Sequence, residues 1–123
     1  MARKRVLLVD DSSTTLVLER LILSHSGYEL QTAKDGVEAL EKGFAQPPDL
    51  VLLDLVLPRV DGLEVCRRLR ADARTRETRI ILVSARSESA MRERGFEYGC
   101  DDFLSKPINS QELLTKVRGL LGD

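Results

Sequence analysis

Four short apolar runs in this 123-residue chain each end in polar or charged residues. The runs occupy positions 6–9, 50–53, 80–83 and 103–104, and they lead into Asp10-Asp11, Asp54, Ser84 and Ser105-Lys106. Short apolar runs separated by helical patterns are typical of buried parallel strands. In open parallel sheets the ligand crevice lies beyond the carboxyl ends of the strands. The sequence therefore predicts an α/β fold with one acidic pocket at a single sheet edge.

The composition is that of one globular domain, which we expect to span residues 1–123. Apolar residues make up 42% of the chain and charged residues 32%, and this length suffices for a sizeable core. The net charge of −1 gives no electrostatic reason to expect binding to nucleic acid or to a membrane. No apolar stretch approaches the roughly 18 residues of a membrane helix, and the N-terminus leaves no room for a signal peptide. We therefore expect a cytoplasmic location.

Five strand–helix pairs are predicted along the chain, which implies a mainly parallel sheet with helices on both faces. The four apolar runs named above are expected to be strands, the first of which starts at residue 5. A further strand is expected at residues 29–33. The expected helix caps are Ser12 or Ser13, Asp35, Asp61 and Asn109. A glutamate stands three residues after each of the last three caps, which is the spacing of a capping box. The first predicted helix carries the apolar residues Leu16, Val17, Leu21 and Ile22.

The segment from Ser87 to Tyr98 is the weakest of the predicted helices. Gly95 lies inside it at a cost of about 1 kcal/mol relative to alanine, and few apolar residues mark a buried face. This weakness suits a moving element, but Gly95 is equally suited to close helix packing. The two cysteines, Cys66 and Cys100, lack metal-site spacing and are expected to be buried thiols.

The predicted pocket holds three carboxylates. Asp10 and Asp11 could simply cap the following helix, and Asp54 could be a surface carboxylate at a strand end. However, two carboxylates about 4 Å apart repel each other by roughly 4 kcal/mol at an effective dielectric of ~20. A cation would relieve that repulsion, and hard oxygen ligands suit Mg²⁺. Asp54 is also a candidate nucleophile, because carboxylates form acyl phosphates in several enzyme classes.

Three further residues are expected near the carboxylates. Lys106 could pair with a carboxylate or neutralise a phosphoryl group, and Pro107 after it could form a cis peptide bond. Ser84 ends the run at 80–83, so its hydroxyl is within reach of the same pocket. Phe103 is by default a core residue, and it could also change rotamer beside Ser84.

Taken in order, these motifs resemble the receiver domain of two-component response regulators. The motifs are Asp10-Asp11, Asp54 followed by Pro58 and Asp61-Gly62, Ser84-Ala85, and the run from Gly99 to Pro107. The likeness covers the whole chain. Each motif alone is weak, but their order and strand-end placement are highly specific. The resemblance implies a flavodoxin-like doubly wound sheet of five parallel strands in the order 2-1-3-4-5, with five helices.

The resemblance also implies a function. Asp11, Asp54 and the backbone carbonyl of Val56 would hold Mg²⁺, and Asp10 would help directly or through a water molecule. Asp54 would accept a phosphoryl group from the phosphohistidine of a sensor kinase or a phosphotransfer protein. Lys106 and Ser84 would contact the phosphoryl oxygens, while Phe103 would turn inward as Ser84 moves. The domain would promote its own phosphorylation and dephosphorylation without being a turnover enzyme. Its signalling face would comprise the fourth helix, the fifth strand and the fifth helix, which would control a target protein or a tethered output domain and could form a dimer.

Two other functions compete with this switch as explanations of the sequence. An aspartyl phosphatase would need a second carboxylate two residues after the nucleophile, where this chain has Val56. A receiver-shaped module that binds partners without phosphorylation would not need the full set of pocket residues. The sequence leaves open whether Arg86 shields the site or contacts a partner, and whether the arginines between Arg59 and Arg94 are solvated or steer an acidic partner.

Overall fold

The computed structural model describes residues 3–85 and 90–123. Its five strands form one parallel sheet in the order β2-β1-β3-β4-β5. The strands are β1 (Arg5–Val9), β2 (Glu29–Ala33), β3 (Leu50–Asp54), β4 (Arg79–Ser84) and β5 (Asp102–Ser105). The predicted sheet and strand order are therefore confirmed, and each strand lies within one residue of its expected position.

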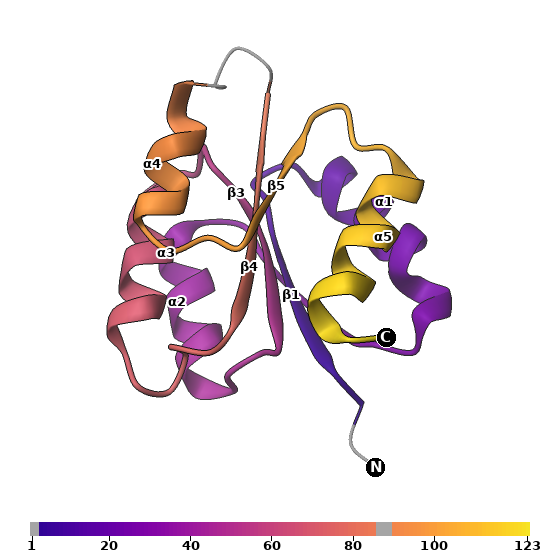
Figure 1. The fold of residues 1–123 in the computed structure, drawn as a ribbon, viewed down its shortest axis with the longest axis horizontal. Coiled ribbons are helices and arrows are strands. Elements are labelled where there is room, and N and C mark those ends of the chain that lie inside the picture. The colour runs from indigo at the N-terminus through magenta and orange to yellow at the C-terminus, as the bar shows by residue number, and fades with distance from the viewer. Residues whose placement is uncertain (1–2, 86–89) are drawn as a thin grey trace.

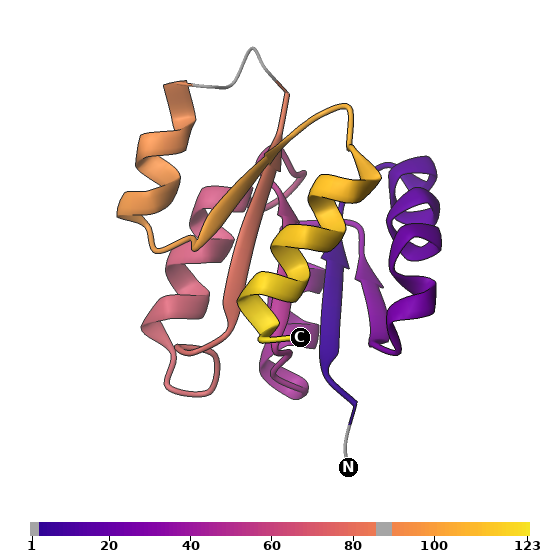
Figure 2. The same ribbon diagram turned by 45° about the vertical axis from the view of Figure 1, so that its right-hand side comes forward.

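Helices cover both faces of this sheet (Figure 1). They are α1 (Ser13–Leu23), α2 (Gly36–Ala45), α3 (Gly62–Ala71), α4 (Arg92–Glu97) and α5 (Ser110–Leu121), and the short 3₁₀ helix η1 (Ser24–Ser26) extends α1. Figure 1 shows α2, α3 and α4 on one face of the sheet and α1 and α5 on the other, and Figure 2 shows the same division from a second direction.

Each face of the sheet has its own apolar core because strand side chains alternate between the faces. Leu7, Val9, Val51 and Leu53 pack under α2 and α3. Their neighbours along the same strands, such as Leu8 and Leu52, pack under α1 and α5. Strand β3 is buried along its whole length, so the residue at its carboxyl end, Asp54, is held on a rigid element.

The helix starts follow the predicted capping chemistry. The side chains of Ser12, Asp35, Asp61 and Asn109 each accept a hydrogen bond from the backbone N–H three residues later. These bonds satisfy donors that the first turn of a helix leaves without partners. Three of the helices therefore begin where the capping boxes predicted, and Ser12 rather than Ser13 caps α1.

Helix α1 presents a different face to the core than its apolar residues suggest. Leu16 is buried, whereas Val17 and Leu21 are 56% and 65% exposed. The inward face between Leu16 and Leu23 is completed by Glu19, which is only 1% exposed. The buried stripe of α1 thus includes a carboxyl group, and three of its apolar residues, Val17, Leu18 and Leu21, face solvent.

Helix α4 is short, and its glycine has a packing role. The expected start at Ser87 lies outside the described residues, and the helix that the structure describes begins at Arg92. A Cβ atom on Gly95 would lie 2.5 Å from Leu82 Cδ1. Gly95 therefore lets α4 lie directly against β4, which supports the packing explanation of this residue.

Two further expectations concern the cysteines and the membrane. Cys66 and Cys100 are free and buried, as predicted. Among the residues that the structure describes, no helix combines the length and the apolar character needed to cross a membrane.

Replacing Gly95 by alanine should destabilise the fold. The new methyl group must displace the buried Leu82 side chain, and overpacking of this kind typically costs about 1–3 kcal/mol. Urea unfolding of the variant measures this loss. Gly119→Ala in α5 is the matched control, because a Cβ there meets no atom within 4 Å, and helix propensity should make it neutral or stabilising. Equal stability of the Gly95→Ala variant and the wild type would contradict the packing role.

Candidate functional site

Three aspartates meet at the carboxyl ends of β1 and β3. Val9 of β1 is paired with Leu53 of β3, so Asp10 and Asp54 leave the sheet at the same level. Asp10, Asp11 and Asp54 each bring a carboxylate oxygen within 4.8 Å of the others. Asp10 and Asp54 are buried, whereas Asp11 is exposed. The predicted acidic cluster is therefore assembled by strand pairing.

Local hydrogen bonds orient the two buried carboxylates. Asp10 Oδ1 accepts a 2.9 Å hydrogen bond from the N–H of Ser12, which caps α1. Asp54 Oδ1 accepts a 3.2 Å hydrogen bond from the N–H of Val56. In both residues one oxygen is thus bound to the backbone of the following loop, and the other oxygen, Oδ2, is left to face its neighbours in the pocket.

Lys106 lies between these two free oxygens. Its Nζ is 3.2 Å from Asp10 Oδ2 and 3.2 Å from Asp54 Oδ2. Its backbone N–H donates a 2.8 Å hydrogen bond to the carbonyl of Ser84, and its peptide bond to Pro107 is cis. Burial alone would lower the pKa of Lys106, but the negative charges of Asp54 and Asp10 outweigh burial and raise it. The ammonium group is therefore firmly charged.

The pocket makes Asp54 a weak acid for an aspartate. Burial is the largest cause, and the negative charge of Asp10 adds to it, so that the pKa of Asp54 rises to about 6 in spite of Lys106. The charge of Lys106 alone is therefore not enough to stabilise the ionised form of Asp54 fully. A divalent cation would supply further positive charge and would favour the ionised form.

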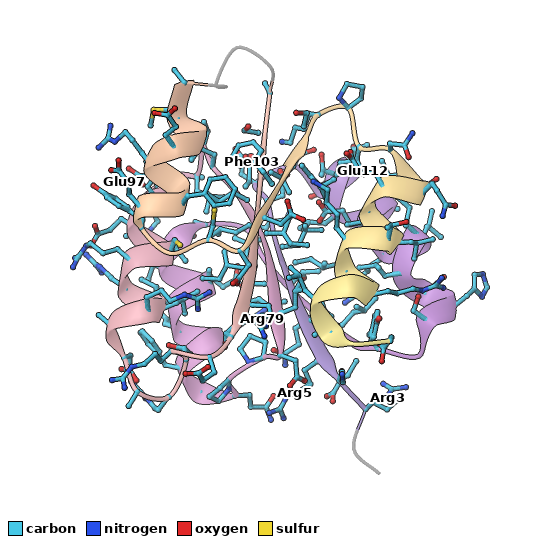
Figure 3. The ribbon with its side chains drawn as sticks, in the orientation of Figure 1. Arg3, Arg5, Arg79, Glu97, Phe103 and Glu112 are labelled. Atoms are coloured by element: carbon cyan, nitrogen blue, oxygen red, sulfur yellow. The ribbon has the colours of Figure 1, made fainter. Side chains whose placement is uncertain are left out.

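Ser84 is the last residue of β4, and Phe103 lies in the adjoining strand β5, paired with Leu82. Ser84 is fully buried, and its Oγ has no hydrogen-bond partner among the described residues. Phe103 is 6% exposed and belongs to the core cluster that includes Cys100. Figure 3 shows the Phe103 side chain in the region between β5 and α4. The ring is thus directed inward, and the Ser84 hydroxyl is an available hydrogen-bonding group.

The remaining predicted residues have different outcomes. The Val56 side chain is 60% exposed, and the role of its carbonyl as a metal ligand stays a prediction. Arg86 lies outside the described residues. Several arginines between positions 59 and 94 form ion pairs within the chain, namely Arg59, Arg67, Arg68, Arg70, Arg74 and Arg79. Those pairs favour the solvated-surface explanation over a band that steers a partner.

Glu19 is the residue near the site that the sequence did not reveal. It is buried on α1, and its Oε1 has no hydrogen-bond partner in the described part of the chain. Burial raises its pKa to about 8, and the next largest cause is the negative charge of Asp10. Its only sequence signal is a carboxylate between Leu16 and Leu23 on the inward face of a helix.

The donor set fits a magnesium ion. Mg²⁺ prefers carboxylate, carbonyl and water oxygens and commonly uses only one or two protein carboxylates. The cluster offers oxygens from Asp10, Asp11 and Asp54. Asp10 Oδ2 accepts no hydrogen bond from the described residues and has only its ion pair with Lys106. Asp11 and the exposed Val56 leave one side of the cluster open to solvent.

Comparison with known proteins identifies the family of this chain. Residues 6–118 match the family described as response regulator receiver domain. The receiver domain of the sensor histidine kinase PA1611 from Pseudomonas aeruginosa, solved with a magnesium ion coordinated in its active-site cleft, superposes with a TM-score of 0.90 at 30% identity. That comparison covers 99% of this chain and all of the solved one.

Curated relatives are longer than this chain. The DNA-binding dual master transcriptional regulator RpaA of Synechocystis is 39% identical over 95% of this chain and 48% of its own length. The response regulator MprA of Mycobacterium leprae is 43% identical over 95% of this chain and 50% of its own length. The chain therefore spans about half the length of these relatives.

Glu19 should make stability depend on pH. Because folding raises its pKa from 4.5 to about 8, the folded state holds this proton more tightly than the unfolded state does. The stabilisation that the folded state gains from this bound proton is fully present below pH ~4.5 and is lost as the pH rises through 8. The wild type therefore loses stability over this range, whereas Glu19→Gln does not. The free energy of unfolding of Glu19→Gln minus that of the wild type should rise by about 3 kcal/mol from pH 5 to pH 8.

Urea unfolding at several pH values measures this difference. The glutamine amide does not titrate, so its own effect on the free energy of unfolding is the same at every pH and cancels from the trend. Glu41→Gln on the exposed side of α2 is the control and should show no such trend. A Glu19→Gln difference that is flat from pH 5 to pH 8 would show that Glu19 titrates normally.

Proposed function

This chain belongs to the response regulator receiver domain family, and from that premise we propose that it is a switch controlled by phosphorylation of Asp54. The observation that carries the proposal is the position of Lys106 Nζ, 3.2 Å from both Asp10 and Asp54. A buried carboxylate at the end of a rigid strand, with a lysine against it and a second acidic pair beside it, suits phosphoryl transfer, which depends on positioning and charge neutralisation.

Asp54 is the proposed phosphoacceptor. One of its carboxylate oxygens forms the new bond to phosphorus as the bond from phosphorus to the imidazole nitrogen of a donor histidine breaks, and the imidazole leaves with the electron pair. Asp10, Asp11 and Asp54, with the carbonyl of Val56, would hold Mg²⁺. The ion would neutralise the charge that gathers on the transferred oxygens.

Lys106 and Ser84 are proposed to receive the phosphoryl group. The Lys106 ammonium already contacts Asp54 Oδ2, so a short movement would bring it to a phosphoryl oxygen. The Ser84 hydroxyl has no partner among the described residues, so it can donate a hydrogen bond without breaking another. Both groups would interact more strongly with the phosphorylated site, and that difference shifts the conformational population.

The output of the switch is proposed to involve Phe103. The Phe103 side chain is buried in this structure. Phosphorylation would stabilise that arrangement and the accompanying surface of α4, β5 and α5. Contacts of Phe103 with the core cluster that contains Cys100 provide the physical link from the pocket to this surface.

The partners follow from this proposal. A sensor histidine kinase or a phosphotransfer protein would supply the phosphoryl group. A target protein or an output domain would respond, and the surface of α4, β5 and α5 would also serve for dimerisation. RpaA is named as DNA-binding as a whole protein; that this chain itself makes no direct contact with nucleic acid stays a prediction. The domain would change its own phosphorylation state without acting as a turnover enzyme.

A phosphorylation assay tests the central step. The chain should acquire one phosphoryl group from acetyl phosphate in the presence of Mg²⁺, as measured by intact mass spectrometry. Asp54→Asn, which removes the nucleophile with little change of shape, should acquire none, and EDTA should abolish labelling of the wild type. Labelling that persists in Asp54→Asn, or a wild-type chain that stays unlabelled, would contradict the proposal, and the second result would favour a phosphorylation-independent binding module.

A second test concerns Ser84. Ser84→Ala removes a buried hydroxyl that has no partner among the described residues, so its free energy of unfolding should change by less than about 1 kcal/mol. Its rate of phosphorylation by acetyl phosphate should fall at least about tenfold, because one phosphoryl-oxygen contact is lost. Ser84→Thr keeps the hydroxyl and is the matched control. A Ser84→Ala rate equal to that of the wild type would remove Ser84 from the proposed site.

A further inference from the structure

The loop between β3 and α3 packs tightly against the start of α2. The N–H of Gly36, the first residue of α2, lies 3.3 Å from the carbonyl of Pro58 and donates a hydrogen bond to it. A Cβ atom on Gly36 would lie 1.9 Å from the carbonyl oxygen of Val60 and 2.6 Å from its Cβ. The backbone from Pro58 to Val60 therefore runs directly over Gly36, and only a residue without a side chain fits there.

The same loop is tied at its other end and at its tip. The N–H of Gly62 donates a 2.9 Å hydrogen bond to the carbonyl of Leu55, which closes the loop on itself. Arg59 has a φ angle of 71°, in the left-handed region that disfavours residues with side chains, and its guanidinium forms a 3.4 Å ion pair with Asp35. A conformation of this kind persists only where surrounding contacts hold it. Those contacts come largely from the start of α2.

We infer that Gly36 is a positioning residue for the divalent cation, because it holds the loop that carries the Val56 carbonyl against α2. The inference rests on the proposed magnesium site. Val56 lies only two residues before Pro58, whose carbonyl accepts the Gly36 hydrogen bond. The carboxylate of Asp10 comes from the end of β1 and is bonded to the Ser12 N–H, away from this loop. Asp54 comes from the end of β3, and its Oδ1 accepts a hydrogen bond from the Val56 N–H. Gly36 therefore acts on the Val56 carbonyl and on the hydrogen bond that orients Asp54, and it leaves Asp10 in place.

The magnitudes support an effect on metal affinity. A Cβ at Gly36 has to move from 1.9 Å to more than 3.0 Å from the Val60 oxygen, so the loop must shift by about 1 Å or more. Magnesium sites tolerate ligand displacements of only about 0.2 Å and require nearly octahedral geometry. Calcium accepts six to eight oxygen ligands in flexible geometry. The substitution Gly36→Ala should therefore weaken Mg²⁺ binding far more than Ca²⁺ binding.

Isothermal titration calorimetry with each ion tests the inference. Gly36→Ala should raise the dissociation constant for Mg²⁺ by about 10- to 100-fold, the usual range for loss of a group that orients a ligand. Its dissociation constant for Ca²⁺ should rise less than about threefold. Gly43→Ala is the matched control in the same helix, since a Cβ there meets only Leu69 Cδ2 at 3.4 Å, and it should leave both constants unchanged.

Each result has a distinct consequence. Wild-type protein that binds no Mg²⁺ would overturn the proposed metal site itself. Wild-type binding together with an unchanged Mg²⁺ constant in Gly36→Ala would overturn only the role of Gly36. An equal loss of Mg²⁺ and Ca²⁺ affinity would show general damage to the pocket, and it would also count against a positioning role.

Amide hydrogen exchange of the wild-type protein provides a test that does not require the variant to fold. If the contact of Gly36 with Pro58 favours cation binding, cation binding must strengthen that contact by the same free energy. Exchange of the Gly36 N–H should therefore slow on addition of Mg²⁺, whereas that of Gly43, in the interior of α2, should not change. Equal exchange of the Gly36 N–H with and without Mg²⁺ would overturn the inference.

Discussion

The ion pairs of Lys106 with Asp10 and Asp54 are the interaction on which the site depends. The two carboxylates end neighbouring strands and are almost fully buried, so without a cation between them their repulsion would oppose the pairing of β1 with β3. Lys106 directly follows β5, the edge strand next to β4. Its N–H donates a hydrogen bond to the Ser84 carbonyl. The order of the strands thus brings the two carboxylates together, and the positive charge of Lys106 offsets their repulsion.

The strands and the pocket were predictable because both follow from short-range patterns. A run such as Leu50 to Leu53 has no polar side to present to water, so it had to be a buried strand, and Asp54 had to stand at its end. The strand order implied by the family resemblance, which the structure confirms, then placed Asp54 beside Asp10. The capping residues Asp35, Asp61 and Asn109 marked helix starts for an equally local reason, since each side chain bonds an N–H three residues away.

Other features depended on packing between distant segments and left little trace in the sequence. Glu19 has the sequence context of a surface glutamate, and only the contact of α1 with the sheet shows that it is buried while Val17 and Leu21 are exposed. The sequence leaves two explanations of Gly95 open, and only its close approach to Leu82 supports the packing explanation. The fit of Gly36 under Val60 joins the start of α2 to the loop before α3, two segments that are separate in the chain. Sequence periodicity cannot report such contacts, because it describes one element at a time.

Three buried side-chain oxygens among the described residues lack a hydrogen-bond partner, namely Asp10 Oδ2, Glu19 Oε1 and Ser84 Oγ. A buried polar group with neither a hydrogen bond nor an ion pair costs about 1–3 kcal/mol. Asp10 Oδ2 is spared that cost by the Lys106 ammonium, 3.2 Å away. Asp10 and Ser84 stand at the carboxyl ends of β1 and β4, and the charge of Asp10 raises the pKa of Glu19. These three oxygens therefore gather at the acidic edge of the sheet, while the two apolar cores are composed of well-buried side chains. A cation would add a second positive charge beside Asp10 Oδ2, which already has its ion pair with Lys106. A phosphoryl group would give the Ser84 hydroxyl a hydrogen-bond partner, which it lacks among the described residues.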